Sequence, residues 1–152
     1  MPLPDIFCKA VTREVLNRIE KLDSHQQPLW GRMSVAQMLA HCCVSYEYIY
    51  EDKYKPPGML MKLILKTMVK NTVTSEKPYA KNSRTAPDFL IREPKDFLEE
   101  KARLINYLIR TQELGKMHFK GKESHAFGKL SCTEWNNMFY KHLDHHLTQF
   151  GV

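Results

Sequence analysis

The sequence predicts an all-α fold, a four-helix bundle with a long crossover connection between the second and third long helices. Three observations predict it. Apolar residues recur at helical spacing in four segments, two of these segments begin with a capping-box sequence, and no segment alternates as a half-buried strand does. A chain of 152 residues with 43% hydrophobic residues can bury a real core, so we expect one domain spanning residues 1–152.

The first two long helices are predicted within residues 5–52. Residues 5–22 place Ile, Val and Leu at helical spacing and form an amphipathic helix. After a loop that contains a proline and a glycine, Ser34 begins the second helix, and Gln37 completes an S-x-x-Q capping box. This second helix is apolar on several sides, so we expect it at the centre of the bundle.

The last two long helices are predicted within residues 94–151. Pro94 suits the first turn of the third helix, whose apolar pattern stops at Gly115. Ser131 begins the fourth helix with a second capping box, and this helix runs to about Phe150.

The crossover connection contains one further helical pattern. Residues 58–71 form an amphipathic helix with a stripe of three lysines, Lys62, Lys66 and Lys70. We expect its apolar side to cover the core and its lysines to lie in water. The alternatives are that this basic amphipathic helix lies on a membrane or a partner, or that its apolar side mediates dimerisation. Residues 72–92 show no regular pattern, which is typical of a functional or mobile loop.

The positive charge of the chain is concentrated in this connection. Residues 53–84 hold eight basic residues against the one acid Glu76, a balance of +7 in a chain whose net charge is +6. The simpler interpretation is a solvated face. The alternative is a patch that attracts anionic substrates or nucleic acid, with Lys62, Lys66 and Lys70 as candidates for binding an anionic cofactor.

The cysteines and the termini indicate the compartment. Cys8, Cys42, Cys43 and Cys132 form neither a disulfide framework nor a C-x-x-C zinc spacing, so we expect the adjacent pair to be small buried residues in a reducing cytoplasm. No apolar run approaches about 18 residues, and the N-terminus lacks the pattern of a secretion signal. We therefore expect a cytoplasmic protein without a membrane partner.

Three histidines near the C-terminus suggest a metal site. At about 100° per residue, His142 and His146 fall within an arc of about 40° on the apolar side of the last helix. This i,i+4 spacing lets two imidazoles share one ion. His145 lies at the flank of the arc and Asp144 on the far side, so we expect them at the surface or orienting a ligand imidazole.

A third ligand is needed, because catalytic zinc-like sites usually have three protein ligands. Of the remaining histidines only His41 lies inside a strongly predicted helix, among mostly apolar residues. We expect it to project into the bundle beside the other two. The alternative is that these imidazoles are hydrogen-bonded packing residues, although burying several unpaired imidazoles costs free energy.

The segment LWGRMSVAQMLAHC, residues 29–42, resembles the DinB/YfiT-like superfamily of metalloenzymes. It has the Trp, the Ser/Thr helix cap and the helix-borne His of that superfamily at Trp30, Ser34 and His41. The resemblance is nearest to an uncharacterised bacterial branch.

The segment FGKLSCTEWNNMFYKHLDHHLTQFG, residues 127–151, carries the more specific part of the resemblance. It has the terminal H-x-x-x-H…Q signature at His142, His146 and Gln149. The order of helices agrees over most of the chain, but residues 53–92 match no motif of the superfamily.

The resemblance implies a divalent metal, commonly zinc or nickel, held at one end of the bundle by His41, His142 and His146. Characterised members include transferases that use bacillithiol or mycothiol and a thiol-dependent isomerase. The resemblance thus implies a thiol-dependent transferase, or a hydrolase, acting on a small molecule, with the metal activating a thiol or water. Tyr48 and His125 are candidates for the acid or base, although Tyr48 can simply pack and His125 can simply bond the loop.

Two other classes of function remain open from the sequence. One is a non-catalytic metal-binding or stress-response module that keeps the bundle without turnover. The other is a nucleic-acid or anionic-membrane binder working through the basic segment, which we rank last because the sequence has no helix-turn-helix pattern and no aromatic-lined binding motif.

Overall fold

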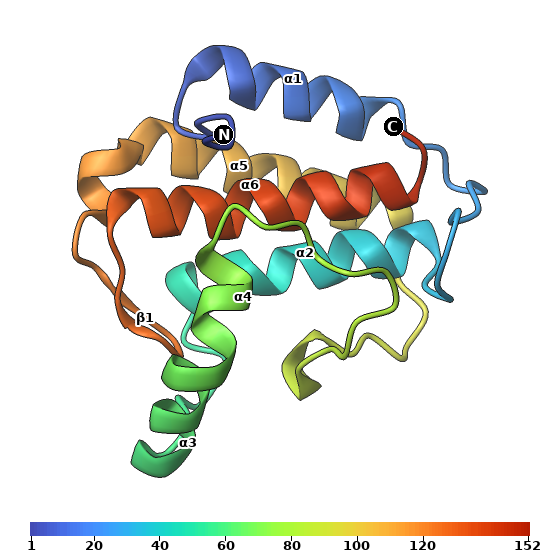
Figure 1. Cartoon of the computed structure of the whole chain (residues 1–152). Helices are drawn as coiled ribbons and strands as arrows, with labels where there is room; N and C mark the ends of the chain where they lie inside the picture. The colour runs from blue at the N-terminus through green and yellow to red at the C-terminus, as the bar shows by residue number, and fades with distance from the viewer.

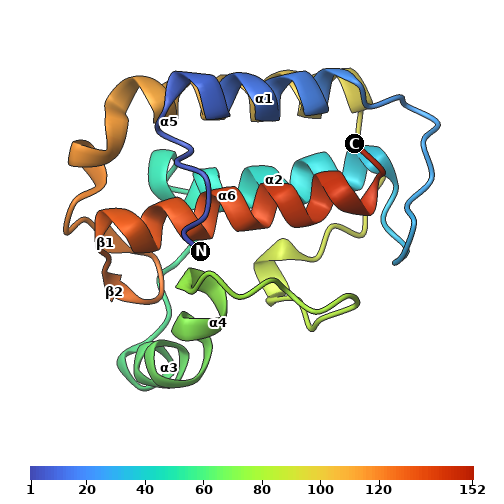
Figure 2. The same cartoon turned by 45° about the horizontal axis from the view of Figure 1, so that its top comes forward.

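The computed structural model describes residues 1–152, and the chain is mostly helical, as predicted (Figure 1). Four long helices run side by side, and both views agree on this (Figure 2). They are α1 (Lys9–Glu20), α2 (Val35–Tyr50), α5 (Phe97–Phe119) and α6 (Cys132–Gln149). The shorter elements are α3 (Met59–Ile64), the π-helical η1 (Leu65–Val69), α4 (Lys70–Thr74), the 3-10 helix η2 (Pro87–Phe89) and the antiparallel pair β1 (Glu123–Ser124) and β2 (Gly128–Lys129).

Both predicted capping boxes are confirmed. The backbone N–H of Gln37 donates to Ser34 Oγ at 3.1 Å, and the N–H of Ser34 donates to Gln37 Oε1 at 3.0 Å. Ser131 and Glu134 make the same reciprocal pair at the start of α6. The two helices that carry the histidines of interest are therefore fixed at their N-termini by local hydrogen bonds.

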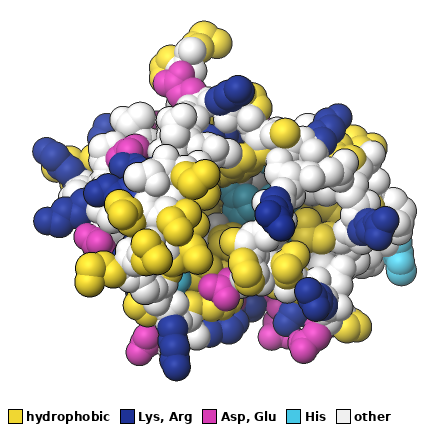
Figure 3. Space-filling model, turned by 60° about the horizontal axis from the view of Figure 1, so that its bottom comes forward, with side chains coloured by type: hydrophobic (Ala, Val, Ile, Leu, Met, Phe, Trp, Pro, Cys, Tyr) yellow, Lys and Arg dark blue, Asp and Glu magenta, His cyan; other side chains and the backbone are white.

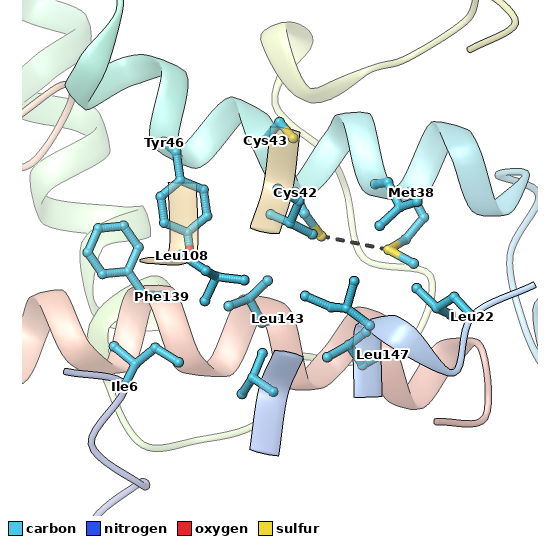
Figure 4. Packing of buried hydrophobic residues seen from close by; sticks show 14 of the residues in the cluster. Ile6, Leu22, Met38, Cys42, Cys43, Tyr46, Leu108, Phe139, Leu143 and Leu147 are labelled. Atoms are coloured by element: carbon cyan, nitrogen blue, oxygen red, sulfur yellow. Dashed lines mark hydrogen bonds between the residues drawn. The ribbon is translucent and has the colours of Figure 1, made fainter. Parts of the chain in front are cut away.

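The core lies between α2, α5 and α6, with α1 closing one side. Helix α2 is buried on most of its surface, as its apolar sequence predicted. Figure 4 shows Cys42, Cys43 and Met38 among leucines of α5 and α6. The Tyr46 ring stacks on Phe139, with ring centroids 5.1 Å apart. The burial of the two adjacent cysteines, neither in a disulfide, agrees with the expectation from the sequence.

The structure corrects the start of two long helices. The first helix begins at Lys9 rather than at residue 5, because Ile6 and Phe7 form a turn that is buried in the core. The N–H of Ile6 donates to Asn136 Oδ1 at 2.7 Å, which holds this turn on α6. The third long helix is capped by Asp96, so Pro94 precedes the helix instead of lying in its first turn.

Gly115 interrupts α5 as predicted, but one more helical turn follows it. Its φ of +72° is a left-handed conformation that favours glycine. The additional turn brings Phe119 into the core beside Trp135, with ring centroids 5.4 Å apart.

The helix predicted at residues 58–71 exists as α3, η1 and α4, but its expected orientation is wrong. Its large apolar side chains are exposed instead of covering the core. Lys70, expected in water, pairs with Glu134 of α6 at 2.7 Å. The segment is held by α6 from the other side, because the Lys141 ammonium donates to the carbonyls of Thr72, Ser75 and Lys77.

The long stretch after α4 is largely irregular, as predicted, with η2 as its one helical turn. None of the helices combines the length and the apolar character that crossing a bilayer requires.

Candidate metal centre

Three histidines from two neighbouring helices meet at the predicted site. His41 lies on α2, and His142 and His146 lie one turn apart on α6. The ring centroid of His41 lies 4.9 Å from that of His142 and 4.5 Å from that of His146. One nitrogen of each ring lies within 4.8 Å of the other two. The structure therefore brings together the three residues selected from the sequence.

Each of the three imidazoles uses its Nδ1 atom for a hydrogen bond. His41 Nδ1 lies 2.9 Å from the carbonyl oxygen of Phe89, and His146 Nδ1 lies 2.8 Å from Gln149 Oε1. His142 Nδ1 lies 3.1 Å from Ser45 Oγ. Metal-ligating histidines usually have this kind of partner on the nitrogen that faces away from the ion.

The side-chain amide of Gln149 has a fixed orientation. Its Nε2 donates to the carbonyl oxygen of Trp30 at 2.7 Å, so its Oε1 must be the atom that faces His146. An amide oxygen only accepts, and His146 Nδ1 therefore carries the ring proton and leaves Nε2 free. The carbonyl of Phe89 fixes the tautomer of a neutral His41 in the same way.

The environment keeps the three rings neutral at pH 7. Burial lowers the pKa of His41, against the opposing effect of its bond to Phe89. Burial, and then the neighbouring His146 and His41, hold the pKa of His142 well below its ordinary value. Burial, and then His41, lower the pKa of His146 to about 3. Neutral imidazoles have the free lone pair that a metal ion needs.

Three neutral imidazole nitrogens suit a divalent metal, and the distance between two of them shows how far the rings would have to move. His142 Nε2 and His41 Nε2 are 2.9 Å apart. Two nitrogens bound to one tetrahedral ion at about 2.0–2.1 Å each lie about 3.4 Å apart, so a small rotation of the rings is needed. Without a metal, His142 Nε2–H donates to His41 Nε2. In that arrangement Nε2 of His146 makes no hydrogen bond within the protein and keeps its lone pair free.

The other two residues of the C-terminal motif do not orient a ligand imidazole. Asp144 Oδ1 accepts from Arg18 Nη1 at 2.7 Å, so it joins α6 to α1. The ring of His145 lies between Trp30 and Tyr79, at centroid distances of 5.7 and 5.6 Å. The positioning role considered for them belongs to Ser45, Phe89 and Gln149.

The two weak candidates for an acid or base lie together. The rings of Tyr48 and His125 stack with centroids 3.9 Å apart, and Tyr48 Oη donates to Asp88 Oδ2 at 2.8 Å. Burial, and then the bond to Asp88, raise the pKa of Tyr48, whereas burial lowers the pKa of His125. The ring of Phe89 contacts Tyr48 on one side and His41 on the other, so the pair lies one aromatic ring away from the histidine cluster.

The three lysines proposed as cofactor ligands do not contact the cluster. Lys70 is occupied by Glu134, and Lys66 lies beside Gly128 of the hairpin. Lys62 is near enough to His125 to lower the pKa of that imidazole further. No hydrogen bond or ion pair joins any of them to His41, so the structure gives no support for a lysine-bound cofactor.

Sequence reasoning missed part of the site. Ser45 lies one turn after His41, a spacing that marks it as a neighbour on the same helix face. Gln149 was visible in the terminal signature but had no assigned contact. The carbonyl of Phe89 had no signal, because it is a backbone atom in a segment without periodicity.

The three histidines differ in exposure, and one face of the molecule is hollowed (Figure 3). Figure 3 turns the bottom of the molecule in Figure 1 toward the viewer. A histidine side chain lies at the floor of a hollow on this face. His142 is the partly exposed member of the three, whereas His41 and His146 are buried. The hollow is flanked by hydrophobic side chains.

These features define a mostly helical protein with a candidate three-histidine metal centre. The chain belongs to a family described as a protein of unknown function, DUF1569, whose sequence profile matches residues 10–151. The matched region includes all three histidines. Comparison with curated proteins and with solved structures finds no match.

Proposed function

We propose that this chain is a divalent-metal-dependent enzyme of the DinB/YfiT-like type, with the ion held by Nε2 of His41, His142 and His146. The observation that carries the proposal is the donor arrangement, in which each Nδ1 has a hydrogen-bond partner and one nitrogen of each ring lies within 4.8 Å of the other two. The likeness of the two histidine-bearing segments to that superfamily supports the same ligands. Zinc and nickel are the metals we expect, since neutral imidazoles suit both.

A divalent ion bound there supplies a Lewis acid that lowers the pKa of a thiol or of water. The chain itself supplies orientation and access. Ser45, Phe89 and Gln149 hold the rings, and the partly exposed His142 marks the side from which a small molecule reaches them. We infer a thiol-dependent transferase or a hydrolase as the reaction class.

His125 is the best-supported proton acceptor. The lowered pKa keeps its imidazole neutral at pH 7, so it can take the proton that a thiol or water loses. Tyr48 remains protonated because its pKa is raised, and its ring supports His125 by stacking. Tyr48 is therefore a positioning residue in this proposal rather than the base.

The test is the metal content of protein purified without a histidine tag, in the native chain and in His142→Ala. We expect about one zinc or nickel ion per chain, lost in the variant. His145→Ala is the matched control, since it removes the neighbouring histidine that faces Trp30, and it should keep the ion. A native protein that contains no ion and takes up neither zinc nor nickel would make the three histidines hydrogen-bonded core residues.

Turnover is tested separately on the metal-loaded protein. One assay combines low-molecular-weight thiols with electrophiles and tests for transferase activity. A second assay supplies simple esters without a thiol and tests for hydrolysis. The proposal of an enzyme is supported if His142→Ala abolishes turnover. It also requires that His125→Gln reduce turnover about 100-fold or more, because general bases contribute about 10²–10⁴-fold. Metal uptake with no turnover of either kind assigns the chain to the non-catalytic metal-binding proteins.

A further inference from the structure

The segment from α3 to η1 exposes an unusually apolar surface, which we call the outward face. Its six side chains are between 39% and 90% exposed. They are Met59, Leu60, Met61, Leu63, Ile64 and Met68. Figure 3 shows a cluster of hydrophobic side chains beside the hollow, on the side where α3 projects in Figure 1. Exposed clusters of this kind usually mark an interaction site.

The orientation of this helix is fixed by contacts on its other side. Lys70 pairs with Glu134, and Asn137 Nδ2 donates to the carbonyl of Thr74 at 2.9 Å. The Lys141 ammonium donates to carbonyls on both sides of Thr74 in the sequence. The apolar side chains therefore point outward because polar anchors hold the opposite side against α6.

Charge identifies the kind of surface that the outward face fits. No acidic residue occurs between Asp52 and Glu76, and five lysines lie in that interval. Lys55 and Lys66 are exposed and form no ion pair, whereas Lys53 pairs with Glu47 at 3.1 Å. Apolar side chains bordered by lysines match a bilayer surface with anionic headgroups, where the apolar groups enter the acyl boundary and the ammonium groups stay at the phosphates.

We propose that the outward face docks the protein on anionic lipid membranes, with α3 lying in the interface rather than crossing it. This site is separate from the histidine cluster and does not depend on the function proposed for it. It departs from the expectation of no membrane partner, which rested on the lack of a long apolar run and on the expected burial of the apolar side of this helix.

Other occupants fit the outward face less well. A second copy would bring two segments of strong positive charge together, which is unfavourable. Nucleic acid would match the charge, but aliphatic side chains neither stack on bases nor hydrogen-bond to them. Helix α3 also projects from one end of the molecule in both views (Figures 1 and 2), so a flat surface can reach it.

The test is sedimentation of the full chain with vesicles of phosphatidylglycerol and phosphatidylcholine, and with phosphatidylcholine vesicles alone. We expect binding to the anionic vesicles only, weakened by salt. The triple variant Leu60→Gln/Leu63→Gln/Met68→Gln should bind at least tenfold more weakly, and Lys55→Gln/Lys66→Gln several-fold more weakly. The control Leu98→Gln/Met117→Gln changes equally exposed apolar residues on α5, 73% and 67% exposed, and should bind normally.

Three results would overturn the proposal. They are no binding to anionic vesicles, equal binding to neutral vesicles, and binding that the triple variant leaves unchanged. Sedimentation velocity is run on the same proteins. A native dimer that becomes a monomer in the triple variant would assign the outward face to a second copy of the chain and also overturn the membrane proposal.

Discussion

Gln149 connects the loop that precedes α2 to His146 of α6 through one side chain. Its amide nitrogen bonds the carbonyl of Trp30, and its amide oxygen bonds His146 Nδ1. The loop that precedes α2 thereby determines which nitrogen of His146 is free. Gly31 follows Trp30 with a φ of +82°, and a Cβ at this position would lie 2.7 Å from Gln149 Nε2. A glycine is needed here for its conformation and for the close approach of Gln149.

We predict that Gln149→Leu weakens metal binding without abolishing it. Loss of the partner that orients a ligand imidazole typically costs about 10–100-fold in metal affinity. Competition with a chromophoric chelator measures this change. Gln27→Leu removes an exposed glutamine and serves as the control. Equal affinity of the native protein and Gln149→Leu would show that His146 does not need this bond.

Gly31→Ala should reduce stability and weaken metal binding together. The left-handed conformation costs a non-glycine residue about 1–2 kcal/mol, and the added Cβ displaces Gln149. Urea unfolding of the metal-free protein measures the first effect and chelator competition the second. Gly58→Ala is the matched control, because nothing lies within 4 Å of its added Cβ and its φ is −61°. An equal loss in both variants would contradict the role given to Gly31.

At the scale of elements, buried ionic side chains join segments that apolar packing does not hold. Lys141 is 4% exposed and ends α4 by bonding three carbonyls. Glu47 is buried on α2 and accepts from Arg103 of α5, and from Lys53 and Tyr54 in the segment that leads to α3. The crossover is thus fastened at both ends by polar contacts.

Lys141→Met should cost about 2 kcal/mol, because hydrogen bonds to a charged group are lost and buried carbonyls lose their donor. The loss should be local. Hydrogen exchange is expected to accelerate most in residues 70–77, with α2 and α5 little changed. Lys129→Met on the exposed hairpin is the control. Uniform acceleration over the whole chain would contradict a local anchoring role.

Glu47 should make the stability depend on acid pH. Burial raises the pKa of Glu47, but hydrogen bonds from Tyr54, Arg103 and Lys53 outweigh this and leave it below the ordinary value of 4.5. The unfolded chain therefore takes up the proton first, and this part of the stability is present above about pH 4.5 and lost as pH falls through the folded-state pKa.

Glu47→Gln should cost about 3 kcal/mol at pH 7, because Arg103 then keeps only Glu100 as an ionic partner and Lys53 loses its own. It should also flatten the decline in stability below pH 4.5. Urea unfolding at several pH values measures both effects, and Glu113→Gln on the exposed surface is the control. A variant as stable as the native protein at pH 7 would contradict the account of this network.

For the molecule as a whole, the sequence predicted the long helices and the three histidines because both are periodic features. Helical spacing marks which side chains face the core, and the i,i+4 spacing put His142 and His146 on one face. The predicted orientation of the segment at residues 58–71 was wrong, because periodicity identifies the apolar side of a helix but not what that side contacts. The orientation is set by Lys70 and Lys141, which contact residues that are distant in the sequence.

The metal should stabilise the whole fold, because its ligands lie on both α2 and α6. At a free concentration of about 100 times the dissociation constant, binding adds about 2.7 kcal/mol. For a chain of this size that raises the melting temperature by roughly 5–10 °C. Differential scanning calorimetry with and without zinc measures the shift. His142→Ala should show no shift, and an equal shift in this variant would place the stabilising site elsewhere.

The most direct test of the central claim is an anomalous difference map at the zinc absorption edge, from crystals grown with zinc. We predict one strong peak at about 2.0–2.1 Å from Nε2 of His41, His142 and His146, with the three Nδ1 atoms still bonded to Phe89, Ser45 and Gln149. No peak between these rings, or an ion held by Nδ1 atoms or by other residues, would contradict the account.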